Sequence, residues 1–177
     1  HFYLYDLNTG KLKRTLTKGD WLVRDLIGYD AESRNLFFSY AEKEEGKNPY
    51  YSHIARVNVR NGRTTQLSSS DADHFVTNPG DFSALLLTMT QGLGIDELGG
   101  LSRSGNFYVE TIQRGDRPTR TVLRNRDGEE IMEVEQEDVS RLPEDFVWPE
   151  VVLLKAADSE TTIVANVYRP SDFSPQR

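Results

Sequence analysis

Two of the three histidines in the chain are candidate metal ligands, and one of them lies beside carboxylates. His53 and His74 are 21 residues apart, and Asp71 and Asp73 lie close to the second histidine. Imidazole nitrogens and carboxylates can bind zinc when they lie on converging elements of structure. The spacing alone does not require such convergence, and two histidines at strand ends would give the same pattern. We therefore predict no metal site.

A run of three serines, Ser68 to Ser70, lies next to Asp71 and four residues before His74. Serine, histidine and a carboxylate can form a triad in which histidine accepts the serine proton and the carboxylate orients the ring. Here all the residues crowd into one polar segment, which is typical of a connection between strands. We predict no catalytic residue in this segment.

The segment from Asp127 to Glu150 holds ten acids and one base, Arg141, so it carries a charge of −9 in a chain of net charge −7. A calcium loop places carboxylates at alternating positions around a sharp glycine turn. Asp127-Gly128-Glu129-Glu130 lacks that spacing. We interpret the segment as a solvated edge or loop and predict no cofactor or metal.

Two further motifs have simple alternatives. Gly92-Leu93-Gly94 is followed by Glu97 where a dinucleotide-binding fingerprint needs its third glycine, so the fingerprint fails. Arg114-Gly115-Asp116 spells an integrin-recognition tripeptide, which we interpret as a chance match within a turn. The stretch from Thr77 to Leu101 contains no lysine or arginine and is rich in glycine, so we expect an insertion or a long loop there.

Composition excludes several classes of protein. The acidic balance of 28 acids against 21 bases argues against nucleic acid as a partner. Zero cysteines exclude disulfides and thiolate chemistry, but they leave the compartment open. No apolar run approaches the roughly 20 residues of a membrane span. The chain begins inside a strand-like segment at His1, so we expect a piece of a longer protein.

Alternation of apolar and polar residues predicts strands along most of the chain. Only Gln136 to Leu142 suggests a helix, which Pro143 would end. The expected strands cover residues 2–7, 11–16, 23–29, 35–40, 54–59, 63–67, 107–112, 120–124, 130–134, 151–154 and 162–168.

These strands repeat. The segment Tyr3 to Leu12 aligns with His53 to Arg63, each with a strand, an Asp- or Asn-containing turn ending in glycine, and a second strand. Four short strands per unit with a period near 40–50 residues are typical of a β-propeller. A β-sandwich with chance similarity between hairpins is the alternative. We predict an all-β fold, a partial propeller of two to three blades built from antiparallel four-stranded sheets.

Several segments match the pattern of one enzyme family when they are taken in order. They are Tyr3-Leu4-Tyr5-Asp6, Leu16-Thr17-Lys18-Gly19-Asp20-Trp21-Leu22-Val23, Gly28-Tyr29-Asp30, Ser102 to Val109, Gly115-Asp116-Arg117-Pro118, Leu154-Lys155-Ala156-Ala157-Asp158, and Val167 to Pro175. In these segments the chain resembles the dipeptidyl peptidase IV group of prolyl oligopeptidase-type serine peptidases. The resemblance covers nearly the whole chain except Thr77 to Leu101.

The resemblance implies a position in the parent protein. Residues 1–148 would be the C-terminal propeller blades, roughly blades six to eight, with 77–101 as the insertion. Residues 149–177 would be a linker and the first strand of a truncated α/β-hydrolase domain. Cutting the propeller in this way would expose the apolar face formed by Phe2, Leu4, Phe37 and Phe38, so we expect the isolated chain to associate.

The resemblance also implies a function. Family members release X-Pro or X-Ala dipeptides from peptide N-termini, and their propeller controls the access of substrate. Their catalytic serine lies on a G-x-S-x-G elbow, which is absent here, and all three triad members would lie beyond Arg177. The glutamates that bind the substrate amine would precede His1. We therefore assign no catalytic, substrate-binding or metal-binding residue and expect this chain alone to be inactive.

The expected partners are a peptide substrate and the chain's own hydrolase domain, with a homodimer as one arrangement open to the parent and no nucleic acid. The resemblance implies an extracytoplasmic parent that is secreted, periplasmic or membrane-anchored. The alternative function is a non-enzymatic β-propeller that acts as a protein-interaction module.

Overall fold

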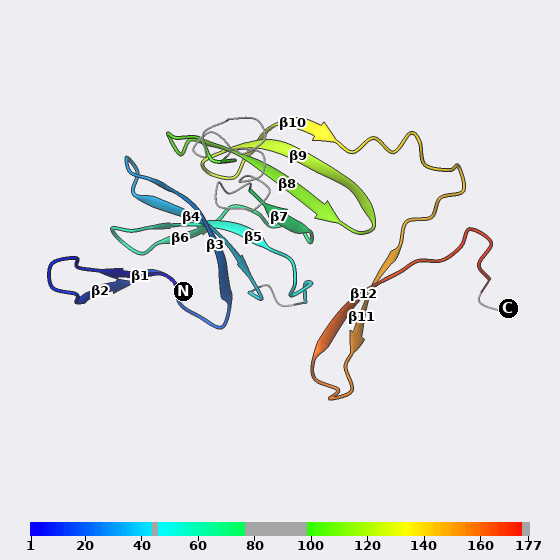
Figure 1. Ribbon diagram of the computed structural model, residues 1–177, viewed down its shortest axis with the longest axis horizontal. Helices are drawn as coiled ribbons and strands as arrows, with labels where there is room; N and C mark the ends of the chain where they lie inside the picture. Colours follow the sequence, from blue (N-terminus) through cyan, green and yellow to red (C-terminus); the bar gives the residue numbers. More distant parts are fainter. Residues whose placement is uncertain (44–45, 77–98, 175–177) are drawn as a thin grey trace, which may run out of the picture.

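The computed structural model describes residues 1–43, 46–76 and 99–174, and within these ranges it contains twelve strands and no helix. The strands form two hairpins and two four-stranded antiparallel sheets (Figure 1). The expected all-β class and partial propeller are thus confirmed. The strands are β1 (Tyr3–Tyr5), β2 (Leu12–Thr15), β3 (Leu22–Asp30), β4 (Asn35–Ala41), β5 (His53–Asn58), β6 (Thr64–Gln66), β7 (Asp73–Phe75), β8 (Phe107–Arg114), β9 (Arg117–Asn125), β10 (Glu130–Gln136), β11 (Glu150–Lys155) and β12 (Thr162–Val167).

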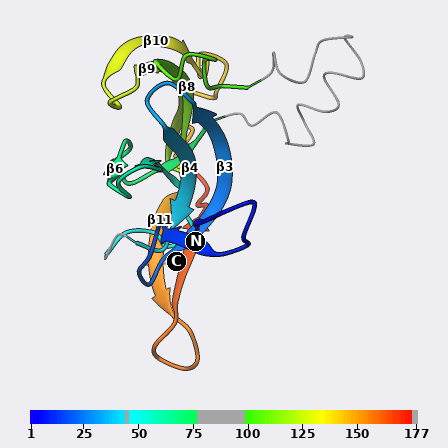
Figure 2. The same ribbon diagram turned by 90° about the vertical axis from the view of Figure 1, so that its left-hand side faces the viewer.

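Each four-stranded sheet is a meander of consecutive strands. The first has the order β3-β4-β5-β6 and the second the order β10-β9-β8-β7. The β1–β2 hairpin lies on one side of the first sheet, and the β7–β10 sheet lies on the other (Figures 1 and 2). A stack of small meanders packed face to face is the arrangement of neighbouring propeller blades.

The repeated turns have the same hydrogen bonds. Gly10 N donates to Asp6 O at 2.8 Å, and Gly62 N donates to Asn58 O at 2.7 Å. The side-chain Oδ1 atoms of Asp6 and Asn58 accept from the backbone N–H groups two and three residues later. Gly10 and Gly62 have φ angles of 66° and 75°, which glycine adopts without steric cost. The sequence repeat is therefore a repeat of one turn geometry.

The core is formed by consecutive residues of β4 that point to opposite faces of the first sheet. Phe37 packs towards the second sheet, where its ring lies 6.5 Å from that of Tyr108. Phe38 packs towards the β1–β2 hairpin, where its ring lies 5.4 Å from that of Phe2. The two-residue periodicity of a strand thus lets β4 contribute to two interfaces between sheets.

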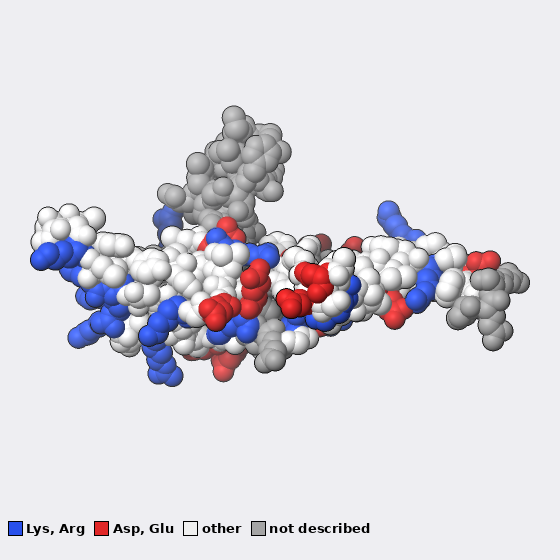
Figure 3. All heavy atoms as spheres, turned by 90° about the horizontal axis from the view of Figure 1, so that it is seen from below, with Lys and Arg blue, Asp and Glu red and all other residues white. Residues whose placement is uncertain are grey.

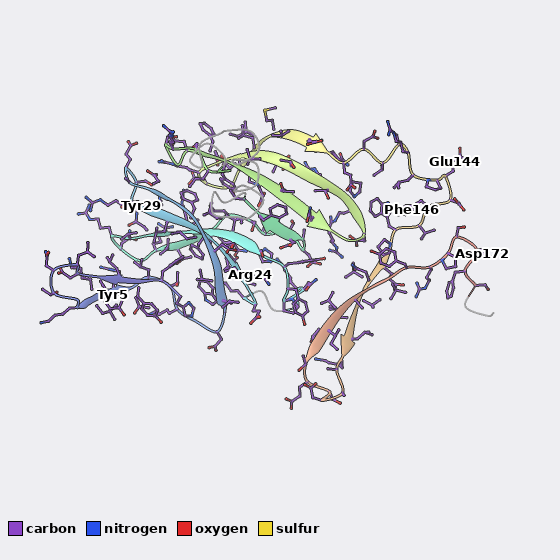
Figure 4. The ribbon with its side chains drawn as sticks, in the orientation of Figure 1. Tyr5, Arg24, Tyr29, Glu144, Phe146 and Asp172 are labelled. Carbon is purple, nitrogen blue, oxygen red and sulfur yellow. The ribbon has the colours of Figure 1, made fainter. Side chains whose placement is uncertain are left out.

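This packing corrects one expectation. Phe37 and Phe38 are 1% and 0% exposed, because the flanking sheets cover both faces of β4. The exposed aromatic side chains of the hairpin are instead Tyr3 and Tyr5, which lie on the face of β1 away from the core (Tyr5 is labelled in Figure 4).

The expected helix over residues 136–142 was wrong. Glu137 N donates to Thr119 O at 2.9 Å, so the chain continues the ladder between β9 and β10 past Gln136. The rest of the segment is exposed and irregular up to Pro143. A seven-residue helix without a packed face gains too little to offset the cost of nucleation.

One further difference concerns strand β7. Strand β7 was missed, because three residues with one apolar member give no alternation. Most of the stretch expected to be an insertion, residues 77–98, lies outside the described residues. Its final residues are described. Gly100 O accepts from Val109 N at 2.7 Å, and Leu101 forms a bridge to Tyr108 and packs against the core.

The C-terminal part forms a hairpin that extends away from the two sheets (Figures 1 and 2). Strands β11 and β12 pair from Glu150 with Val167 to Lys155 with Thr162. The segment beyond the hairpin returns beside the connection between β10 and β11, where Ser171 Oγ donates to Asp145 Oδ2 at 2.8 Å. Glu144, Phe146 and Asp172 mark the two segments in Figure 4.

Candidate functional site

The second sheet positions a row of ionisable side chains on the face that covers the first sheet. His74 lies on β7, Glu110 on β8 and Arg124 on β9. In the strand register His74 is opposite Ile112, and Glu110 is opposite Val122. Because side chains alternate along each strand, the three polar residues project from the same face of the sheet.

These residues form a continuous chain of contacts. His74 Nε2 lies 2.8 Å from Ser70 Oγ, and His74 Nδ1 lies 2.9 Å from Glu110 Oε1. The second carboxylate oxygen of Glu110 accepts from Arg124 Nε. Arg124 also donates through Nη1 to Gly128 O at 3.0 Å. The chain of contacts therefore connects the loop before β7 to the turn between β9 and β10.

Burial sets the electrostatics of the network. Burial raises the pKa of Glu110, but the hydrogen bond and charge of His74, followed by those of Arg124, outweigh burial and lower the pKa below its usual value. The neighbouring Tyr108 hydroxyl is also buried, and burial together with the Glu110 charge raises its pKa. Glu110 is thus held as a buried carboxylate that two cationic or hydrogen-bonding partners compensate.

The order Ser70–His74–Glu110 matches the donor–acceptor order of a hydrolytic triad. Three features distinguish it from a catalytic arrangement. Arg124 occupies the second oxygen of Glu110, and the backbone carbonyl of Ser70 lies 3.2 Å from the same His74 nitrogen that faces its hydroxyl. Ser70 also lies on a connection between strands rather than on a strand-to-helix elbow. We interpret the network as a buried ion pair that ties three strands together.

The structure brings His53 and His74 together, although the sequence did not require it. Their ring centroids are 5.4 Å apart, and the rings are inclined by 33°. The two aspartates that lie beside His74 in the sequence bind other groups. Asp73 Oδ1 accepts from Ser52 N at 2.7 Å, and Asp71 Oδ2 pairs with Arg114 at 2.6 Å. Within residues 1–43, 46–76 and 99–174, no group of three His, Asp or Glu side chains is arranged to hold a metal ion.

The Arg114-Gly115-Asp116 tripeptide forms the tight turn between β8 and β9. Arg114 Nε lies 3.0 Å from Asp116 Oδ1, so the two charged side chains pair with each other.

The acidic segment that begins at Asp127 is partly neutralised within the sheet, because Arg120 pairs with Glu130 at 3.0 Å and with Glu133 at 2.8 Å. All residues of β10 are exposed.

Sequence reasoning missed Glu110 and Arg124. A usable signal existed, because Tyr108, Glu110 and Ile112 alternate on one strand face, where a charge among apolar residues requires a partner. The identity of that partner depends on strand order.

In the part of the chain that the structure describes, no helix is long and apolar enough to cross a membrane.

Comparison with known proteins shows similarity to one protein family and to solved structures. The family model of the dipeptidyl peptidase IV N-terminal region matches residues 1–91. Among solved structures, a protein from Bacteroides ovatus ATCC 8483 assigned as a dipeptidyl aminopeptidase IV has a similar fold, with a TM-score of 0.66 and 22% sequence identity. The match covers 95% of this chain and 20% of that chain, so the chain spans about a fifth of that protein's length.

Proposed function

Because the chain belongs to the family of the dipeptidyl peptidase IV N-terminal region, we propose that it is the propeller side of a serine exopeptidase. The parent enzyme would release X-Pro or X-Ala dipeptides from the N-termini of peptides. The family match over residues 1–91 is the observation that carries this proposal. The stack of meander sheets is consistent with it.

In this proposal the two sheets restrict the access of peptides to a catalytic domain. The β11–β12 hairpin would join the chain to that domain. The hairpin exposes Leu153, Leu154 and Ile163, and Tyr168 just beyond it is 71% exposed. Exposed apolar side chains of this kind gain free energy when a neighbouring domain covers them. They support a hydrolase domain as the first partner, and the proposed activity requires a peptide as the second.

The test is to read the coding sequence beyond Arg177 and to express the longer protein. The proposal predicts a G-x-S-x-G motif, and a longer protein that cleaves a Gly-Pro chromogenic substrate. Replacement of the motif serine by alanine should abolish the cleavage while the protein stays folded. A longer protein that lacks the motif and does not cleave the substrate would contradict the proposal and favour an interaction module.

A further inference from the structure

A groove separates the β1–β2 hairpin from the outer strand of the first sheet. Its volume is about 380 Å³. This lies within the roughly 300–1,000 Å³ typical of small-molecule pockets. We call it the basic groove, and it is lined by Arg14, Thr15, Leu16, Thr17, Lys18, Trp21, Lys43, Asn61, Gly62 and Thr64.

Its lining carries charge of one sign. Arg14, Lys18 and Lys43 line the groove, and among residues 1–43, 46–76 and 99–174 no acidic residue does so. None of these three side chains forms an ion pair with another described residue, whereas the neighbouring Lys13 pairs with Asp6 at 2.7 Å. Figure 3 shows Lys and Arg side chains gathered at the end of the molecule where β1 and β2 lie. This positive groove exists in a chain of net charge −7.

Packing positions two of the cations. Lys43 Nζ lies 5.7 Å from the ring centre of Trp21 and 5.2 Å from that of Tyr40. The Trp21 indole is in turn fixed by a hydrogen bond from Nε1 to Lys18 O at 3.0 Å. A cation held above aromatic rings keeps its charge while part of its hydration shell is removed. The Lys43 ammonium group is therefore held at a fixed position in the groove, against the rings of Trp21 and Tyr40.

The second cation, Arg14, reaches from the hairpin to the first sheet. Its Cδ and Nη1 atoms lie 3.7 Å from the position that a Cβ on Gly62 would occupy. The Arg14 side chain therefore lies beside the turn between β5 and β6. Because a guanidinium offers five N–H donors in one plane, it suits oxygen atoms of an anion.

We propose that the basic groove binds a small multivalent oxyanion, such as the phosphate group of a phosphorylated compound. Arg14, Lys18 and Lys43 would supply the charge, and the hydroxyl groups of Thr15 and Thr64 would supply neutral hydrogen bonds. Anions of this geometry are recognised by combined guanidinium and ammonium groups. The proposal does not depend on the peptidase function, because every residue that lines the groove belongs to the hairpin, the first sheet or the loops that adjoin them.

The chain offers a built-in reporter for the test. It contains two tryptophans, Trp21 and Trp148, so the variant Trp148→Phe leaves the groove indole as the one remaining tryptophan. In this background, inorganic phosphate and pyrophosphate are titrated while Trp21 fluorescence is recorded. Chloride at matched ionic strength measures the non-specific response. The expected result is a saturable change with both phosphates and none with chloride.

Matched variants locate the site. Arg14→Ala and Lys43→Ala should each weaken pyrophosphate binding about tenfold or more, as expected for the loss of a charge-assisted hydrogen bond. Lys13→Ala removes the same charge from the same strand but lies outside the groove lining, so it should bind like the parent. Equal weakening of pyrophosphate binding in all three variants would overturn the proposal. A Trp21 fluorescence change that does not saturate with phosphate or pyrophosphate concentration would overturn it as well.

A further titration separates phosphate from carboxylate. Citrate carries several carboxylates without a tetrahedral oxyanion, and it should bind more weakly than pyrophosphate. Equal binding of citrate would instead indicate acidic peptide segments, including those of a second copy of the chain, and would overturn the proposal of a phosphate-type ligand. Sedimentation of the parent and of Lys18→Ala would then show whether copies associate through the groove.

Discussion

The Nδ1 atom of His74 lies 2.9 Å from Oε1 of Glu110, and the two side chains are 1% and 0% exposed. They come from adjacent strands and from positions 36 residues apart in the chain. A buried carboxylate in such a contact is stabilised only as long as its partners remain. The pair therefore makes the second sheet sensitive to substitution and to acid.

The first prediction concerns the removal of the charge. Glu110→Gln removes the buried carboxylate that pairs with Arg124. It also replaces the charged hydrogen-bond acceptor of His74 by a neutral amide. Breaking a buried pair in this way costs about 3–5 kcal/mol. Urea unfolding followed by circular dichroism should show that loss. Glu133→Gln breaks an exposed contact with Arg120 and should cost less than about 1 kcal/mol. Equal effects of the two variants would contradict a special role for Glu110.

The second prediction concerns pH. The pKa of Glu110 is lower in the folded state than its usual value of 4.5. The stabilisation is therefore fully present above pH 4.5 and is lost as the pH falls through the folded pKa. Urea midpoints measured from pH 6 to pH 3 should decrease in the parent protein. The decrease should be smaller in Glu110→Gln, and an identical decrease would show that other carboxylates are responsible.

The third prediction concerns the interface between the hairpin and the first sheet. Phe38 is fully buried there, and its ring stacks on Trp21 with centroids 6.1 Å apart. Phe38→Ala should destabilise the chain by about 3–5 kcal/mol. The variant should also shift the fluorescence of Trp21 to longer wavelength, because water reaches the indole. Tyr29→Ala removes a half-exposed ring on β3 and serves as the control. It should change both quantities much less.

The fourth prediction concerns Gly28 and Leu101. A Cβ added at Gly28 would lie 2.7 Å from Leu101 Cδ2. Because that atom is the end of a flexible side chain, Gly28→Ala should force Leu101 to shift and should cost no more than about 1 kcal/mol. Leu101→Ala in the same background removes the opposing methyl group and should relieve that cost, so the two substitutions will not be additive. Additive effects in thermal unfolding would contradict the contact between residue 101 and β3.

The fifth prediction concerns reactivity. The chain lacks a G-x-S-x-G elbow, and Ser70 faces a histidine whose carboxylate partner is shared with Arg124. We expect no turnover of a Gly-Pro chromogenic substrate above a buffer blank. We also expect no labelling by a fluorophosphonate probe. Labelling that disappears in Ser70→Ala but persists in Ser69→Ala would show that the Ser70–His74–Glu110 arrangement is a reactive centre after all.

The positions of most strands and of two turns could be predicted from the sequence alone. Alternation of apolar and polar residues predicted eleven of the twelve strands that the structure describes, because one face of most of these strands packs against a neighbour. The Asp6 and Asn58 turns predicted two hairpins, because their side chains accept backbone hydrogen bonds two and three residues ahead. Order and spacing of these units also indicated the family.

Tertiary structure alone decided which of these residues meet. Glu110 reaches His74 because β7 and β8 are neighbours, and Phe37 and Phe38 are covered because sheets lie on both sides of β4. The basic groove likewise joins Arg14, Lys43 and Gly62 from three separate segments. Side-chain alternation fixes the face on which a residue lies, but the partner across that face depends on sheet order and packing, which act between residues distant in the chain.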